Sequence, residues 1–242
     1  MSNRSLLIAA NWKMNSAPKS LETYKSHGNI DVIVFPTFLD LIPCINAGIV
    51  TGGQFGRPEN TGAFTGDISM KMLKDIGCTS VLCGHSDRRQ FHFESNEFVA
   101  EQAAAALQQE LHPIVCVGEN EAEHDAGRGK EIVESQVRAV LKSIGAAAIT
   151  FAYEPIWAIS RGDPNKPAAT SADAEGMHAF IRSLLPSSHA ERTRILYGGS
   201  MKATNCEELL RQPNIDGGLI GGASLDPVQF GIIVNTATAI IK

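Results

Sequence analysis

Eight short apolar segments recur along the chain, and amphipathic patterns lie between several of them. Most of these segments are continuously apolar rather than alternating, as expected of strands buried on both faces of a parallel sheet. Eight such strands alternating with helices predict an α/β fold, a single (β/α)8 barrel. The predicted strands are 6–10, 32–35, 49–52, 80–83, 114–117, 149–153, 194–197 and 218–220.

Apolar residues at helical spacing predict the helices between these strands. In the last helix, Asp226 is expected as the cap and Pro227 as the first helical residue. The interval 15–29 has room for at most about three helical turns. Three further stripes are Val99, Ala103, Ala106 and Leu107, with Ser95 as a possible cap; Val133, Val137, Val140 and Ile144; and Met177, Phe180, Ile181 and Leu184.

A doubly wound sheet would show the same alternation of strands and helices. However, no G-x-G-x-x-G follows the first strand, where a dinucleotide site would place it. No linker, charge run, repeat or low-complexity segment marks a boundary, so residues 1–242 are predicted to form one domain.

Bulk composition narrows the class of partner. A net charge of −5 argues against nucleic acid, whose phosphates require a basic surface. The five cysteines form no C-x-x-C pair, and their odd number fits reduced thiols better than a disulfide framework. No signal peptide or membrane-length apolar run is apparent. We therefore expect a cytoplasmic protein with a small-molecule partner.

Polar side chains follow the predicted strands at the rim where barrels carry their chemistry. Glu154 ends a buried strand beside Trp157 and Ile159, where burial would raise its pKa and suit it to act as a base. The alternative is a carboxylate that ends a strand and faces solvent. Asn11 and Lys13 follow the first strand, and an amide beside an ammonium suits a developing oxyanion.

His85 follows the fourth strand and precedes a predicted helix start at Ser86 and Asp87. A helix N-terminus disfavours the imidazolium, so a neutral, hydrogen-bonding histidine is expected there. A histidine that only satisfies a backbone carbonyl is the alternative. Zinc is disfavoured because His85 and His92 lack metal-ligand spacing.

Two glycine-rich turns follow the last two strands, at 198–200 and 221–222. Glycine lets backbone N–H groups approach an anion closely, and many barrels bind phosphate after strands seven and eight. Phosphate is therefore the leading ligand. Segment 160–170, from Ser160 to Thr170, is polar and follows the candidate base, so it is either a lid that excludes water or a surface loop.

Seven motifs in order give the chain a close resemblance to the triosephosphate isomerase family. They are A-N-W-K-M-N (10–15), G-A-F-T-G-D (62–67), G-H-S-D-R-R (84–89), C-V-G-E (116–119), A-Y-E-P-I-W-A-I (152–159), Y-G-G-S (197–200) and G-G-A-S-L (221–225). The resemblance implies interconversion of dihydroxyacetone phosphate and glyceraldehyde 3-phosphate through an enediolate, in glycolysis and gluconeogenesis, without metal or organic cofactor.

The resemblance also implies roles for individual residues. Glu154 would be the base, His85 the neutral electrophile and proton shuttle, Lys13 the cation that stabilises the enediolate, and Asn11 a donor to the substrate oxygen. The implied phosphate ligands are Ser160, Ser200, Gly221 and Gly222. The implied supporting residues are Ser86, Asp87, the apolar clamp Ile159 and Leu219, and Tyr197 at the latch of the lid.

Segment 54–67, from Gln54 to Asp67, resembles the family loop that inserts beside a partner's site, with Thr65 at its tip. A homodimer is therefore implied.

Three departures stand out: Asp87 replaces the family's usual glutamate, segment 160–166 is atypical and longer, and the first two helical regions are short. Two rival functions remain. One is an isomerase or aldolase-like enzyme acting on another phosphorylated sugar. The other is a non-enzymatic phosphate-binding or interaction barrel.

Overall fold

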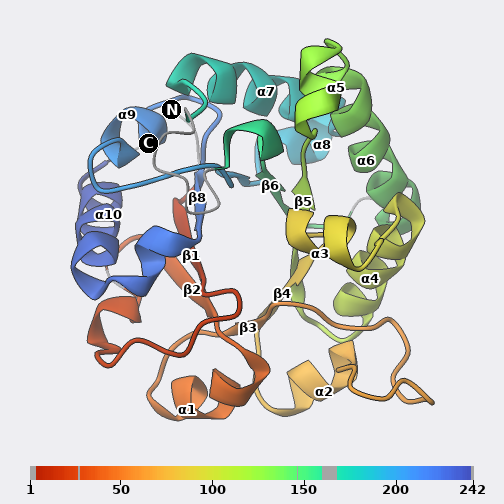
Figure 1. The fold of residues 1–242 in the computed structure, drawn as a ribbon, viewed down its shortest axis with the longest axis vertical. Helices are drawn as coiled ribbons and strands as arrows, with labels where there is room; N and C mark the ends of the chain where they lie inside the picture. The colour runs from red at the N-terminus through yellow and green to blue at the C-terminus, as the bar shows by residue number, and fades with distance from the viewer. Residues whose placement is uncertain (1–3, 27, 146, 160–167, 241–242) are drawn as a thin grey trace.

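The computed structural model describes residues 4–26, 28–145, 147–159 and 168–240. Parallel strands form one sheet in the order β2-β1-β8-β7-β6-β5-β4-β3, curved into a ring with helices outside it (Figure 1). The predicted α/β barrel is confirmed. The strands are β1 (Leu7–Asn11), β2 (Asp31–Phe35), β3 (Gly52–Gly53), β4 (Ser80–Cys83), β5 (His112–Val117), β6 (Thr150–Tyr153), β7 (Ile195–Tyr197) and β8 (Gly217–Ile220).

The ring closes between β2 and β3 through a short contact. Val34 bridges to Thr51, and its N–H donates to the Val50 carbonyl at 2.9 Å. This bridge lies outside the named strands, and β3 itself lies slightly later than predicted, at Gly52–Gly53. Glycine is needed here because a Cβ at Gly52 would lie 2.3 Å from the Phe35 ring.

Side chains alternate between the barrel interior and the helix-facing side, as the two-residue period of a strand requires. On β1, Leu7 and Ala9 point inward, whereas Ile8 and Ala10 pack against the outer helices. The interior cluster consists of Leu7, Ala9, Ile33, Phe35, Leu82, Ile114, Cys116, Ala152, Leu196 and Leu219.

The predicted helix caps are present. Ser95 accepts from the Phe98 N–H, and Asp226 accepts from the Val228 N–H with Pro227 beginning the helix. The α-helices are α1 (Leu41–Asn46), α2 (Met70–Asp75), α3 (Ser86–Phe91), α4 (Asn96–Gln108), α5 (Glu121–Asp125), α6 (Gly129–Ile144), α7 (Ser171–Leu184), α8 (Ser187–Ala190), α9 (Cys206–Leu210) and α10 (Pro227–Ala239). The 3-10 turns are η1 (Glu22–Tyr24), η2 (Phe38–Asp40), η3 (Ile156–Ala158) and η4 (Gly222–Leu225).

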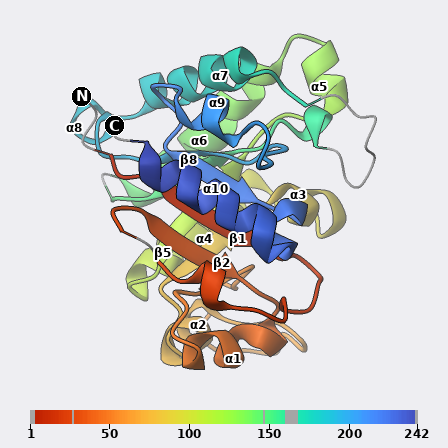
Figure 2. The same cartoon turned by 90° about the vertical axis from the view of Figure 1, so that its left-hand side faces the viewer.

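The connection from β1 to β2 carries only η1 in its described residues, so the short first helical region is reduced to one turn. Helix α10 lies across the outside of β1 (Figure 2). Tyr24 of η1 packs against this helix, where its ring stacks on Phe230 with centroids 4.8 Å apart. Its hydroxyl donates to the Ser224 carbonyl at 2.7 Å. No helix in the described part of the chain is long and apolar enough to cross a membrane.

Candidate active site

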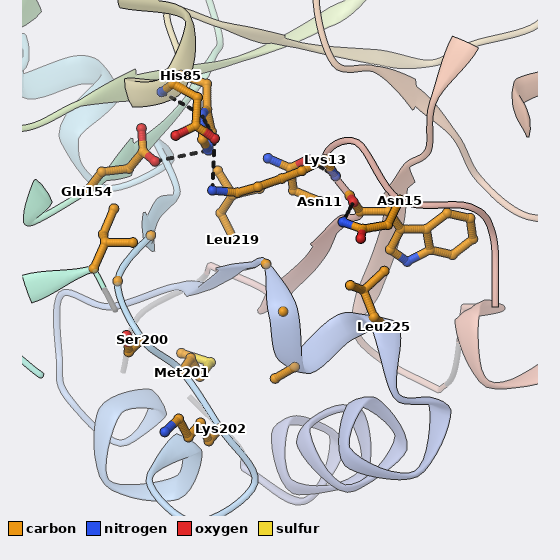
Figure 3. A pocket seen from close by; sticks show the side chains of 18 of the residues that line it. Asn11, Lys13, Asn15, His85, Glu154, Ser200, Met201, Lys202, Leu219 and Leu225 are labelled. Atoms are coloured by element: carbon orange, nitrogen blue, oxygen red, sulfur yellow. Dashed lines mark hydrogen bonds and ion pairs between the residues drawn. The ribbon is translucent and has the colours of Figure 1, made fainter. Parts of the chain in front are cut away.

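A cavity of about 730 Å³ opens at the carboxyl ends of the strands. Figure 3 shows side chains from β1, β4, β6 and β8 converging there. The structure brings together at its wall ten residues singled out from the sequence: Asn11, Lys13, His85, Asp87, Glu154, Ile159, Ser200, Leu219, Gly221 and Gly222.

Glu154 follows β6 and is 3% exposed. Its Oε2 accepts from the Ser86 N–H and its Oε1 from the Ser86 hydroxyl, both at 2.9 Å. The His85 Nε2 lies 3.1 Å from Oε1. The carboxylate is therefore not the solvent-facing strand end considered from sequence, but a buried group held beside an imidazole.

Two glycines make room for Glu154. A Cβ at Gly118 would lie 1.8 Å from the Glu154 carbonyl oxygen, and one at Gly198 would lie 2.8 Å from the Glu154 Cγ. Because real atoms do not approach this closely, the chain must lack a side chain just after β5, where it passes the Glu154 backbone, and just after β7, where it passes the Glu154 side chain.

His85 is the N-cap of α3, and its Nδ1 accepts from the Asp87 N–H at 3.1 Å. A ring nitrogen that accepts carries no proton, so this arrangement assigns the neutral tautomer with its proton on Nε2. That proton is on the side of the ring near Glu154. The neutral histidine expected at this helix start is thus supported by the cap geometry.

Lys13 has a backbone φ of +50°, an uncommon conformation for a residue with a Cβ. Both peptide groups around it are held: its N–H donates to Asn11 Oδ1 at 3.0 Å, and its carbonyl accepts from Gln54 Nε2 at 2.8 Å. Such strain persists where the surroundings over-determine it, commonly at functional sites. The bonds from Asn11 and Gln54 direct the Lys13 side chain over the barrel mouth.

The departure at Asp87 does not break its contact with the cation. Asp87 Oδ2 lies 3.0 Å from Lys13 Nζ and 3.6 Å from His85 Nδ1. Each partner of the Lys13–Asp87 pair is about one-third exposed, so the pair is expected to contribute at most about 1 kcal/mol to stability. Its consequence is positional, since it aims the ammonium across the cavity.

The glycine turn after β8 lies next to this cation. A Cβ at Gly221 would be 3.6 Å from the Lys13 Cε, in ordinary contact. The turn is closed by Ser224, whose N–H and hydroxyl both donate to the Gly221 carbonyl, at 2.8 and 2.7 Å. Backbone amides of a braced turn beside an ammonium form a suitable site for an anion.

The remaining sequence-predicted residues lie elsewhere. Tyr197 and Ser86 are buried behind the cavity wall. Thr65 is exposed and does not line the cavity, and Ser160 lies outside the described residues.

Gln54 and Glu119 have positioning roles that the sequence reasoning did not assign. Gln54 directly follows β3, and this position at a strand end is the sequence feature that could have marked it as a residue of the barrel mouth. Glu119 follows β5 and is 1% exposed; its Oε1 accepts from the Tyr153 hydroxyl at 2.9 Å and from the Trp157 Nε1 at 2.7 Å. In the described part of the chain, no group of three or more His, Cys, Asp or Glu side chains is placed to hold a metal ion.

The family model for triosephosphate isomerase matches residues 6–237. The chain belongs to the triosephosphate isomerase family. Curated triosephosphate isomerases align along nearly the whole chain. The one from Pseudoalteromonas translucida is 40% identical and covers 98% of each chain. The one from Rubrobacter xylanophilus is 41% identical over 96% of each chain. A Salmonella paratyphi B relative is also 41% identical, over 96% of this chain and 97% of its own.

Proposed function

We propose that this cavity interconverts dihydroxyacetone phosphate and D-glyceraldehyde 3-phosphate, the reaction of its family, in glycolysis and gluconeogenesis. The observation that supports this most directly is the convergence of a buried carboxylate, a neutral imidazole and an ammonium at one cavity wall, through Glu154, His85 and Lys13. An anion-binding turn at Gly221 and Gly222 lines the same cavity.

The reaction moves one proton between two neighbouring carbons and one between two oxygens. Glu154 removes the proton from the carbon beside the carbonyl and returns it to the adjacent carbon. His85 donates its Nε2 proton to the carbonyl oxygen as negative charge develops there, and recovers a proton from the neighbouring hydroxyl. Lys13 and the Asn11 amide stabilise the enediolate, because donors fixed in advance need no reorganisation when charge develops.

Glu154 must exchange partners for this chemistry. Both of its oxygens are engaged by Ser86. We infer that substrate binding draws the carboxylate away from Ser86 toward the carbon, and that Ile159 and Leu219, which line the same cavity, shield it from water. The phosphate is held by the amides of the Gly221 turn, with Ser200, which lines the same cavity, and Ser160 as further proposed ligands.

A matched pair of substitutions tests the proposal. Glu154→Gln keeps the shape of the base and removes its basicity, so kcat is expected to fall by at least about 10²-fold in a coupled isomerisation assay. The control Glu134→Gln changes a half-exposed residue of α6, which pairs with Arg138 and does not line the cavity, and should leave kcat unchanged. Wild-type protein that binds a phosphoglycolate-type inhibitor but turns over no substrate would instead favour the phosphate-binding alternative.

We also propose a homodimer. Large apolar side chains are exposed near the cavity rim and on the loop 54–67: Met14 is 95% exposed, Phe91 62% and Phe64 38%. Arg57 braces this loop, with its guanidinium 3.7 Å from the centre of the Phe64 ring. Met14 directly follows Lys13, so a partner at this face would lie beside the site. Sedimentation should give twice the chain mass, and Met14→Glu should lower it.

A cytoplasmic location is proposed with the metabolic role. The five cysteines are free and buried, as suits a reducing compartment.

A further inference from the structure

An imidazole lies on the segment that carries Glu154, outside the cavity. His124 of α5 stacks on the indole of Trp157, with ring centroids 3.9 Å apart and an angle of 17° between the planes. Trp157 is in η3, three residues after Glu154. His124 does not line the cavity, so any effect it has on the reaction passes through Trp157.

Glu119 connects this stack to the base. Its backbone carbonyl accepts from the Ile156 N–H at 3.2 Å, and its Oε1 accepts from the Trp157 indole at 2.7 Å. One residue therefore holds η3 by both main chain and side chain. The Glu154 N–H is bound to the Val117 carbonyl at 2.8 Å, so the whole segment is attached to the end of β5.

The carboxylate of Glu119 is incompletely compensated. Its Oε2 is buried and accepts no hydrogen bond from the described residues. The His124 Nδ1 lies 3.9 Å from Oε1. A proton on His124 would place a cation against both the Glu119 carboxylate and the face of the indole.

Several other charged groups near His124 are engaged with other partners. Helix α5 packs against η3, which has no titratable side chain, and against α6. In the first turn of α6, Lys130 lies over the Phe180 ring and Glu131 pairs with Arg128 at 3.7 Å. Among the described residues, the other titratable neighbours are Glu121, Glu123 and Asp125 of α5, together with Tyr153. Glu123 accepts from the Asn120 N–H, and the Tyr153 hydroxyl donates to Glu119.

We propose that His124 is a pH-responsive positioning residue for Glu154. Histidine is the side chain that ordinarily changes charge between about pH 5 and 8. In its charged form His124 tightens the contact of Trp157 with Glu119 and keeps the base-bearing segment in the arrangement where Glu154 is bound by Ser86. In its neutral form the segment moves more readily and the base reaches substrate more often. This kinetic consequence rests on the proposed function; the stacked cluster itself does not.

Trp157 fluorescence tests the cluster without turnover. A protonated imidazole in contact with an indole quenches its emission, so the fluorescence of the wild-type protein should fall as pH drops from about 8 to 5. His124→Phe preserves the stack and removes the charge, so this transition should disappear. Trp157→Phe assigns the signal, because the only other tryptophan, Trp12, is fully buried and contacts Tyr24 edge-on.

Two variants then test the effect on catalysis. The kcat of His124→Phe, divided by that of wild type, should rise from about 1 at pH 8 to about 2–5 at pH 5, as expected for an exposed cation–π contact. His124→Arg keeps a permanent charge on the indole, so its ratio should be about 1 at pH 5 and about 0.2–0.5 at pH 8. KM should be unchanged in both variants. Other groups that titrate in both variant and wild type affect both kcat values equally, so they cancel in the kcat ratio.

Identical fluorescence titrations in wild type and His124→Phe would overturn the proposal, and so would kcat ratios that stay constant with pH. If the wild type lacked isomerase activity while the fluorescence transition depended on His124, the cluster would stand and the proposed function would fail. Parallel thermal unfolding of the variants shows whether a change in kcat reflects folding.

Discussion

Substituting Gly198 with alanine probes how closely the base is fitted into the barrel. An added Cβ would lie 2.8 Å from the Glu154 Cγ and 3.0 Å from the Tyr153 carbonyl oxygen. Carbon atoms in contact are normally about 3.5–4.0 Å apart, so Glu154 must move by about 0.7 Å or more. The neighbouring backbone is fixed by the Gly198 N–H bond to the Tyr153 carbonyl at 2.7 Å, so the flexible side chain yields first.

A shift of this size at a preorganised site has a large kinetic effect. Misplacement of a catalytic group by about 1 Å can cost about 10²-fold in rate, so kcat of Gly198→Ala should fall by about 10- to 100-fold. Overpacking should also lower the free energy of unfolding by about 1–3 kcal/mol. Steady-state isomerisation kinetics and urea unfolding measure the two effects separately.

Gly176→Ala is the matched control, because beyond its own helix turn no atom of the described residues lies within 4 Å of the added Cβ in α7. Alanine has a higher helix propensity than glycine, so this variant should be stabilised by up to about 1 kcal/mol with unchanged kcat. A Gly198→Ala enzyme with kcat within twofold of wild type would refute the argument that this glycine creates the space for Glu154.

Two further predictions concern other groups. Asp87→Glu should change kcat by less than about threefold, since Asp87 already reaches Lys13 at 3.0 Å; a larger loss in the isomerisation assay would show that the site depends on the shorter acid. Burial lowers the pKa of His112 from 6.5 to about 4, helped by the nearby charge of Arg194. Between about pH 6.5 and 4, the folded protein therefore binds fewer protons than the unfolded chain. The free energy of unfolding should fall as pH drops through this range. Urea unfolding of His112→Gln at pH 7 and pH 5 should show a smaller decrease than wild type, and an equal decrease would contradict this assignment.

The strand pattern and the rim residues were predictable because each depends on local sequence. Continuous apolar runs indicate buried parallel strands, and the residue after each run must then lie at the barrel mouth. Asp226 and Ser95 cap their helices through bonds to residues two or three positions away, which the sequence shows directly.

Contacts between distant segments could not be predicted in the same way. Gln54 supports the Lys13 carbonyl from 41 residues away, and its type alone does not indicate this partner. The space that Gly118 and Gly198 leave for Glu154 depends on how closely neighbouring strands pass, which no single-strand pattern records. The predicted start of the third strand was too early for a related reason. Its apolar run begins at Ile49, but the pairing with β4, which the sequence of one strand does not show, begins at Gly52.

Tyr24 joins the connection between the first two strands to the turn proposed to hold the phosphate. The described residues of that connection form one 3-10 turn, η1, whose Tyr24 packs on Phe230 and donates to the Ser224 carbonyl in the turn that closes over Gly221. A hydroxyl outside the barrel thus braces the turn proposed to hold the phosphate. Sequence changes in this connection, usually regarded as a tolerant surface loop, would therefore alter how tightly the phosphate end of the substrate is held, far from the carbons that react.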